Sequence, residues 1–313
     1  MTDFKNLGLS IMGSKRRLAP TLITEMVKNH IEKYQTIPVH FIDGFGGGGA
    51  MSFSALNYGF LSVTYNELNT AIVTMLQHVQ KNRKLTHEFY EWVGKEDFDL
   101  FKRGDDIQSG ICQSFYSFGG NQKDYSFGKQ ELMLSEFHAL VADSNQDILN
   151  EWNQKHNKNI PLKDPNKLFE TLRDRKLRFK KAFFKKGCRH GEQFERIAQL
   201  EKICCYPRFQ QLNLINGSFD ELVILTPPNE TIVYFDPPYQ NTRKYNQKHQ
   251  SKGNDLNKKV FDYMAKSEYT IYLSEYESPF EEIYSVKHRN QMNQRNKGNK
   301  PTIEKLFVNK GKI

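Results

Sequence analysis

The sequence predicts an α/β fold, in which a doubly wound, mostly parallel sheet of the Rossmann-like type carries an inserted, mainly helical module. Three observations predict it. Short apolar runs suited to buried parallel strands alternate with helical segments near both ends of the chain. A glycine-rich turn follows the first of these runs. The middle of the chain is instead polar, aromatic and basic.

The first α/β unit occupies the N-terminal part of the chain. Apolar residues recur at helical spacing over residues 18–34, at Leu22, Ile23, Met26 and Val27 and again at Ile31. After this helix we expect, in order, a strand over 39–42, a helix over 50–57, a strand over 61–65 and a helix over 68–81. This alternation of strands and helices is typical of a parallel sheet.

Short β-rich runs return late in the sequence, over residues 212–215, 231–235 and 269–273. The sheet is therefore expected to form from both ends of the chain. We predict one domain over residues 1–84 and 208–313, interrupted by an inserted module over 85–207. Helices are expected in the module over 167–184 and 191–203, and a mobile loop is expected over 241–257.

The chain is basic, with 45 Lys and Arg against 36 Asp and Glu and a formal charge of +9. Such a charge favours a polyanionic partner. The segment 173–190 concentrates basic residues and interleaves them with phenylalanines. We favour a DNA-binding surface, although a solvated helix face would have the same composition. The candidate phosphate-binding residues are Arg173, Arg175, Lys176, Arg178, Lys180 and Lys181.

The four cysteines lack the spacing of a zinc site, so no metal is expected. The first residues lack the apolar core of a secretory signal. No run approaches the roughly 18 apolar residues that a membrane span requires. These features predict a soluble, cytoplasmic protein without a membrane partner.

The turn from Asp43 to Gly49 places four consecutive glycines between an expected strand and an expected helix. Glycine lets the backbone approach a ligand closely and adopt positive φ. Dinucleotides, phosphates and S-adenosylmethionine all bind at such turns. Glu67, at the end of the next strand, can accept hydrogen bonds from the ribose hydroxyls of an adenosyl ligand. The alternative is a purely structural loop beside an exposed glutamate.

The run Asp236-Pro-Pro-Tyr239 directly follows the apolar strand expected over 231–235. Two prolines end the strand, fix φ twice and remove two backbone donors. The Asp236 carboxylate and a proline carbonyl are then acceptors without a competing N–H, and Tyr239 offers a flat aromatic face. Two acceptors and a stacking ring suit the exocyclic amine of a nucleobase. An ordinary strand-ending turn is the alternative.

Three motifs, in this order along the chain, resemble those of the Dam-type DNA adenine-N6 methyltransferases. They are Met12-Gly-Ser-Lys15, the glycine turn from Asp43 to Gly49, and Asp236-Pro-Pro-Tyr239. Looser matches are 216–220, Ser274 and 304–309, whereas Gly44, Glu67 and Glu275 depart from the family pattern. The resemblance covers about residues 8–82 and 208–310.

This resemblance implies a Rossmann-like methyltransferase sheet that binds S-adenosylmethionine and methylates the N6 amine of an adenine flipped out of double-stranded DNA. The catalytic residues it implies are Asp236, Pro237, Pro238 and Tyr239. The expected cofactor-binding residues are Met12, Gly13, Lys15, Asp43, Phe45, Gly47, Gly49, Glu67 and Asp236. Tyr245 is expected to contact the flipped base, and the inserted module to recognise the DNA target.

Other functions stay open on the sequence alone. The same chemistry could act on cytosine N4, on adenine in RNA or on a glutamine side chain, although an Asp before Pro-Pro favours adenine. A non-catalytic nucleic-acid-binding protein could keep the same fold. A nicotinamide dehydrogenase could too, but it would leave Asp-Pro-Pro-Tyr without a purpose. In a restriction-modification system, a cognate restriction nuclease would be a further partner.

Overall fold

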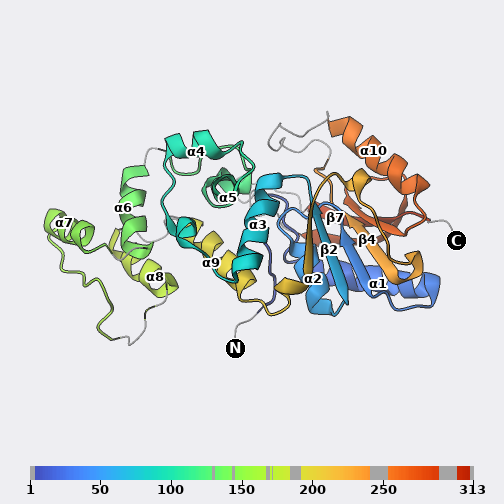
Figure 1. Ribbon diagram of the computed structural model, residues 1–313, viewed down its shortest axis with the longest axis horizontal. Helices are drawn as coiled ribbons and strands as arrows, with labels where there is room; N and C mark the ends of the chain where they lie inside the picture. Colours follow the sequence, from blue (N-terminus) through green and yellow to red (C-terminus); the bar gives the residue numbers. More distant parts are fainter. Residues whose placement is uncertain are drawn as a thin grey trace.

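The computed structural model describes residues 4–128, 131–142, 145–166, 170, 172–183, 192–239, 253–288 and 302–310. Within these residues, a sheet of seven strands has the order β3-β2-β1-β4-β5-β7-β6 (Figure 1). The strands are β1 (His40–Asp43), β2 (Ser62–Glu67), β3 (Leu212–Asn216), β4 (Thr231–Phe235), β5 (Ile271–Glu275), β6 (Glu281–His288) and β7 (Thr302–Val308). The α/β class and the mostly parallel sheet are therefore confirmed.

Strands β1 to β5 pair in parallel, whereas β7 runs antiparallel between β5 and β6. Strand β4 is buried along its whole length, as its apolar sequence requires for a central parallel strand. Ile232 and Tyr234 join the apolar cluster on one face of the sheet, and Val233 and Phe235 join the cluster on the other. Because side chains alternate along a strand, β4 is apolar on both faces.

Helices cover both faces of this sheet. Helices α1 (Ala19–Tyr34) and α2 (Ala50–Tyr58) pack together on one face, and α10 (Gly253–Lys266) covers the other through Val260 and Met264 (Figure 1). Helix α10 begins at Gly253, so residues 253–257 are helical and do not belong to the loop expected over 241–257. The rest of that loop lies outside the described residues.

The middle of the chain is helical, as expected. Its helices are α4 (Lys95–Phe101), α5 (Ile107–Ile111), α6 (Glu131–Ala142), α7 (Gln146–His156), α8 (Leu172–Phe183) and α9 (Glu192–Cys204). Helix α5 packs on α3 (Thr70–Asn82), whereas α6, α7 and α8 lie at the end of the molecule remote from the sheet (Figure 1). The same apolar cluster contains Val63 of β2 and Phe115 and Phe194 of the helical region. The helical region therefore shares a continuous core with the sheet.

Candidate active site

Three acidic residues lie at the carboxyl ends of neighbouring parallel strands. Asp43 ends β1, Glu67 ends β2 and Asp236 directly follows β4. Strand β1 pairs with β2 on one side and with β4 on the other, so the chain order of the strands reverses there. In open α/β sheets, ligands bind outside the carboxyl ends of the strands at this point. The position makes these residues the candidate site.

The glycine turn adopts a conformation that requires glycine. Gly47 and Gly49 have φ values of +49° and +76°, in the left-handed region. A Cβ on Gly48 would lie 2.7 Å from the carbonyl oxygen of Leu9, whose N–H donates to the Gly48 carbonyl at 2.7 Å. The N-terminal segment therefore lies directly against the glycine turn through Leu9, three residues before the Met12–Lys15 motif.

Glu67 contacts the glycine turn through one carboxylate oxygen and the segment after β2 through the other. One oxygen accepts the N–H of Gly47 at 2.8 Å, and the other accepts the N–H of Asn69 at 2.8 Å. The Tyr65 hydroxyl donates to the carbonyl of Gly47 at 2.8 Å. Glu67 thus has a structural task in addition to the ribose contact that the sequence predicts, since it fixes the turn where a ligand would lie.

Asp43 is almost completely buried, with 1% of its surface exposed. One carboxylate oxygen accepts the Ser52 hydroxyl at 2.7 Å, and the other has no hydrogen-bond partner among the described residues. Burial raises the pKa of Asp43 to about 7, and the neighbouring Asp236 and Glu67 carboxylates act in the same direction. A buried acceptor without a donor is costly, so this oxygen is suited to receive a ligand's donor.

Asp236 belongs to a compact cluster of charged groups. The Lys15 ammonium lies 3.0 Å from an Asp236 oxygen and 3.4 Å from a Glu304 oxygen. The Tyr239 hydroxyl donates to the same Glu304 oxygen. The Lys15 Nζ also lies 4.6 Å from the centroid of the Tyr239 ring, a cation–π distance. We call these four residues the Lys15 cluster.

Burial and neighbouring charge act together in the Lys15 cluster. Burial raises the pKa of Asp236 to about 6; the Lys15 charge opposes this shift, whereas Glu304 adds to it. Burial alone would lower the pKa of Lys15, but the Asp236 and Glu304 carboxylates outweigh it and the pKa is raised. The Lys15 ammonium thus stays charged between the half-buried Asp236 carboxyl and the buried Glu304 carboxyl.

The other residues expected at the site have varied surroundings. The Met12 N–H donates to the carbonyl of Gly120 at 3.2 Å, and Gly13 is exposed with a φ of +82°. The Phe45 ring packs against Phe219, with centroids 5.0 Å apart, and belongs to the apolar cluster under α10. Pro237 and Pro238 come directly after Asp236, beyond the end of β4, whereas Tyr245 lies outside the described residues.

The sequence interpretation missed the role of Glu304. The run 304–309 is only a looser match to the family pattern, and the motif predicts Lys15 as a cofactor-binding residue alone. The sequence does contain a signal for this role. Glu304, Leu306 and Val308 are two residues apart along β7 and therefore lie on the same face of the strand. All three side chains are buried. A carboxylate in such an apolar row indicates a buried polar partner.

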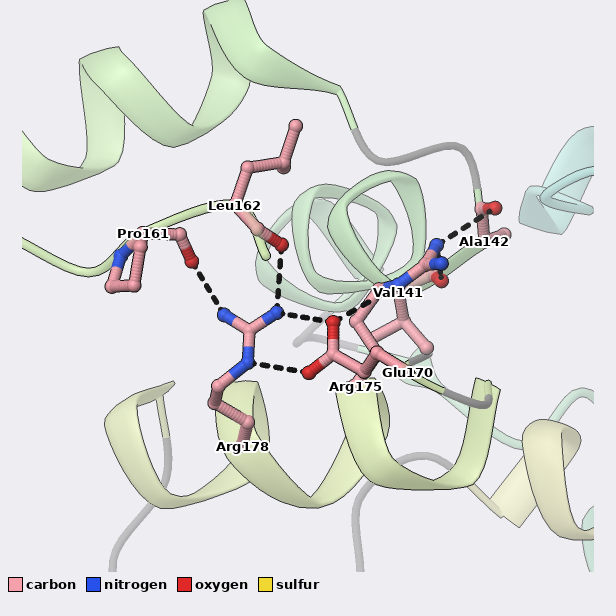
Figure 2. Close-up of polar contacts among 7 residues, drawn as sticks. All are labelled: Val141, Ala142, Pro161, Leu162, Glu170, Arg175 and Arg178. Atoms are coloured by element: carbon pink, nitrogen blue, oxygen red, sulfur yellow. Dashed lines mark hydrogen bonds and ion pairs between the residues drawn. The ribbon is translucent and has the colours of Figure 1, made fainter. Parts of the chain in front are cut away.

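The basic segment is arranged differently from the expected DNA-binding surface (Figure 2). The Arg178 guanidinium forms two 2.7 Å contacts with the Glu170 carboxylate and also donates to the carbonyls of Pro161 and Leu162. Arg175 donates to the carbonyl of Val141 at 2.8 Å. These two arginines face their own fold, so they hold α8 against its neighbours.

Of the remaining basic candidates, Lys180 and Lys181 are more exposed to solvent than Lys176. Lys176 is buried and forms an ion pair with Glu195 at 2.7 Å. Lys180 is half-buried and Lys181 is exposed, so these two ammonium groups are the better placed to meet a phosphate. The side chain of Arg173 lies outside the described part of the structure.

We expect Arg178→Ala to lower the free energy of unfolding by about 3 kcal/mol, because the largely buried Glu170 carboxylate loses its two short contacts and keeps only the longer 3.8 Å ion pair with Arg175. Urea unfolding followed by circular dichroism measures this effect. Lys181→Ala is the matched control on the same helix and should unfold like the wild type. If Arg178→Ala kept wild-type stability and only weakened DNA binding with a flatter salt dependence, the phosphate contact predicted from sequence would stand instead.

No helix of the described residues is both long enough and apolar enough to cross a membrane. In the same part of the chain, no three His, Cys, Asp or Glu side chains come together as metal ligands would. Comparison of the chain with protein-family models and with curated proteins finds no match, so the site is interpreted from its own geometry.

Proposed function

We propose that this chain transfers a methyl group from S-adenosylmethionine to the N6 amine of an adenine flipped out of double-stranded DNA. The observation that carries the proposal is the position of Asp236 in the Asp-Pro-Pro-Tyr run. It lies at the end of β4 beside Asp43, where the order of the parallel strands reverses. An acceptor for a substrate amine and a glycine-rich ligand turn thus occupy one edge of the sheet.

The residues of this edge fit an adenosyl cofactor. A Cβ at Gly47 would meet no atom closer than 3.5 Å, so the turn leaves room for a ligand there, and the partnerless buried oxygen of Asp43 would accept a donor such as the cofactor's ammonium group. Glu67, which ends the neighbouring strand, would accept from the ribose hydroxyls. When bound, S-adenosylmethionine supplies an electrophilic methyl group. Among the protein residues, Lys15 and Glu67 hold the N-terminal segment and the glycine turn around it.

The substrate amine needs two acceptors because its lone pair is delocalised into the adenine ring. The Asp236 carboxylate and the Pro237 carbonyl each accept one N6 hydrogen, which localises the lone pair on the nitrogen. The nitrogen becomes positively charged during transfer, and Asp236 together with Glu304 outnumbers the single Lys15 charge. This excess of negative charge is preorganised where positive charge develops. Tyr239 would stack on the flipped base.

The sheet topology helps to separate this proposal from a nicotinamide dehydrogenase. The dinucleotide-binding fold has the strand order 3-2-1-4-5-6. Here the antiparallel β7 enters between β5 and β6 and delivers Glu304 to the Lys15 cluster. Asp236 and Tyr239 are engaged by that cluster, which gives the Asp-Pro-Pro-Tyr run a role that hydride transfer would not need. Double-stranded DNA stays the proposed partner because of the charge of +9.

The direct test supplies the purified protein with tritium-labelled S-adenosylmethionine and unmethylated plasmid DNA, followed by nucleoside analysis. We expect the label in N6-methyladenine. Label in N4-methylcytosine, or transfer only to RNA, would support the corresponding alternative. If the protein bound DNA but neither bound nor consumed the cofactor, a non-catalytic DNA-binding protein would be the better description.

A further inference from the structure

Glu304 is a carboxylate in an unusual place. It lies on the antiparallel strand β7, in the row that also contains the buried Leu306 and Val308, and 3% of its surface is exposed. An apolar side chain there would pack without the cost of removing a charge from water. A buried ion pair is seldom a net gain in stability over apolar packing, so a buried carboxylate calls for a functional explanation.

The contacts of Glu304 join two segments that are far apart in the sequence. One oxygen accepts the Tyr239 hydroxyl from the segment after β4 and lies 3.4 Å from Lys15, which precedes α1. Lys15 in turn contacts Asp236 at 3.0 Å. Tyr276, which follows β5, packs its ring edge-on to Tyr239 with centroids 4.8 Å apart. Glu304 is thus the acceptor that fixes the phenol end of Tyr239 while sharing the Lys15 charge.

Sharing the Lys15 charge has a consequence for Asp236. A substrate amine can donate a hydrogen bond to the Asp236 carboxylate only if the ion pair with Lys15 does not occupy that carboxylate completely. With Glu304 present, the ammonium has a second carboxylate within 3.4 Å and can remain charged while Asp236 turns to another donor. With a neutral residue at position 304, only Asp236 would remain of the two carboxylates that contact the buried Lys15 ammonium.

We propose that Glu304 is a positioning residue for the methyl transfer: it anchors Tyr239 beside the substrate base and serves as the second counter-ion of Lys15, which leaves Asp236 able to accept the substrate amine. The inference rests on the proposed function. It assigns to the final hairpin of the sheet a role in substrate positioning that the Asp-Pro-Pro-Tyr run cannot fulfil alone.

The charge of Glu304 should also affect the protonation of Asp236. The groups that act on Asp236 are Lys15, Glu304 and Tyr239, and the neighbouring Asp43, Tyr234 and Tyr276 also sense its charge. Glu304 raises the pKa of Asp236 by repulsion, whereas the Tyr239 hydroxyl lowers it. Removal of the Glu304 charge should therefore lower the pKa of Asp236, whereas removal of the Tyr239 hydroxyl should raise it.

The test compares Glu304→Gln with Tyr239→Phe in the chain of 313 residues. Carboxyl carbon NMR, with the Asp236 signal assigned from Asp236→Asn, follows the titration in both variants. We expect the pKa of Asp236 to fall in Glu304→Gln and to rise in Tyr239→Phe. An unchanged pKa in Glu304→Gln, or a fall of equal size in both variants, would overturn the proposal. A circular dichroism melt of each variant shows that the titration comes from folded protein.

Transfer kinetics supply the second part of the test. Glu304→Gln keeps an oxygen for the Tyr239 hydroxyl, so KM for DNA should stay near the wild-type value while the acidic limb of kcat moves to lower pH. Glu304→Ala loses the acceptor as well, and KM should rise roughly tenfold. Equal losses in both variants without a pH shift would mean a merely structural role. If the wild type transfers no methyl group, the proposed function fails, whereas the NMR titration still decides whether Glu304 controls Asp236.

Discussion

Asp236→Ala is expected to reduce methyl transfer at least roughly 100- to 1000-fold, as the loss of one preorganised polar contact in a transition state does. The fold should survive this change. Lys15 keeps Glu304 as a carboxylate partner at 3.4 Å, so the variant replaces a cluster of two carboxylates and one ammonium with a one-to-one pair. The expected loss of activity therefore comes from weaker stabilisation of the transition state and not from disrupted core packing.

The measurement is a tritium-transfer assay beside a thermal melt and a cofactor-binding isotherm. Asp262→Ala, which removes an exposed carboxylate from α10, is the matched control and should keep full activity. Retention of most of the activity by Asp236→Ala would refute the assignment of Asp236 as the amine acceptor. A loss of activity that merely follows unfolding would refute it as well.

Lys15→Met should have the second-largest effect, because it leaves the half-buried Asp236 and the buried Glu304 without their shared ammonium. The pKa of Asp236, already raised to about 6 by burial, should rise further once the opposing Lys15 charge is gone. More of the Asp236 carboxyl is then protonated at neutral pH and cannot accept an amine hydrogen. We expect transfer to fall steeply at pH 7 and to recover in part at higher pH.

The stability of Lys15→Met should depend on pH with a defined sign. An acid whose pKa is higher in the folded than in the unfolded state binds its proton more tightly when folded, so stability falls as pH rises from the unfolded pKa to the folded pKa. The deficit relative to wild type should therefore be small near pH 5 and grow to about 3–5 kcal/mol near pH 8. Thermal melts at both pH values measure it.

Arg17→Met is the control for this variant, because it removes an exposed positive charge two residues further along the same segment. It should show neither the activity loss nor the pH-dependent deficit. If Lys15→Met melted in parallel with the wild type at both pH values, the Lys15 ammonium would not be the group that holds down the Asp236 pKa against the effect of burial.

Much of the sheet was predictable because its signals are local. The apolar run over 231–235 coincides with β4, and the helical periodicity over 18–34 differs from α1 by one residue at its start. A continuous apolar run predicts that both faces of the strand are buried, since a central parallel strand needs apolar residues on both faces. The expected strand over 269–273 is displaced to 271–275, because pairing with β4 and β7 decides where a strand begins.

The basic segment shows where local patterns fail. Composition predicts a cationic surface equally well whether a side chain faces solvent or its own fold. The Glu170 carboxylate and the carbonyls of Pro161 and Leu162 decide the matter for Arg178, and they lie 8 to 17 residues away in the chain (Figure 2). A guanidinium group forms such bonds only where the fold brings several acceptors together.

The α/β class, the positive φ of the glycine turn and the place of the Asp-Pro-Pro-Tyr run at a strand end could all be predicted from the chain. Each of these follows from residues that are adjacent in the chain. The partners of the charged groups could not be predicted in this way, because they depend on how distant segments pack. Lys15, Asp236 and Glu304 are separated by 221 and then 68 positions, and they meet because β7 turns back antiparallel beside β5. A buried charge is stable only beside its counter-charge, and the folded chain alone supplies that proximity.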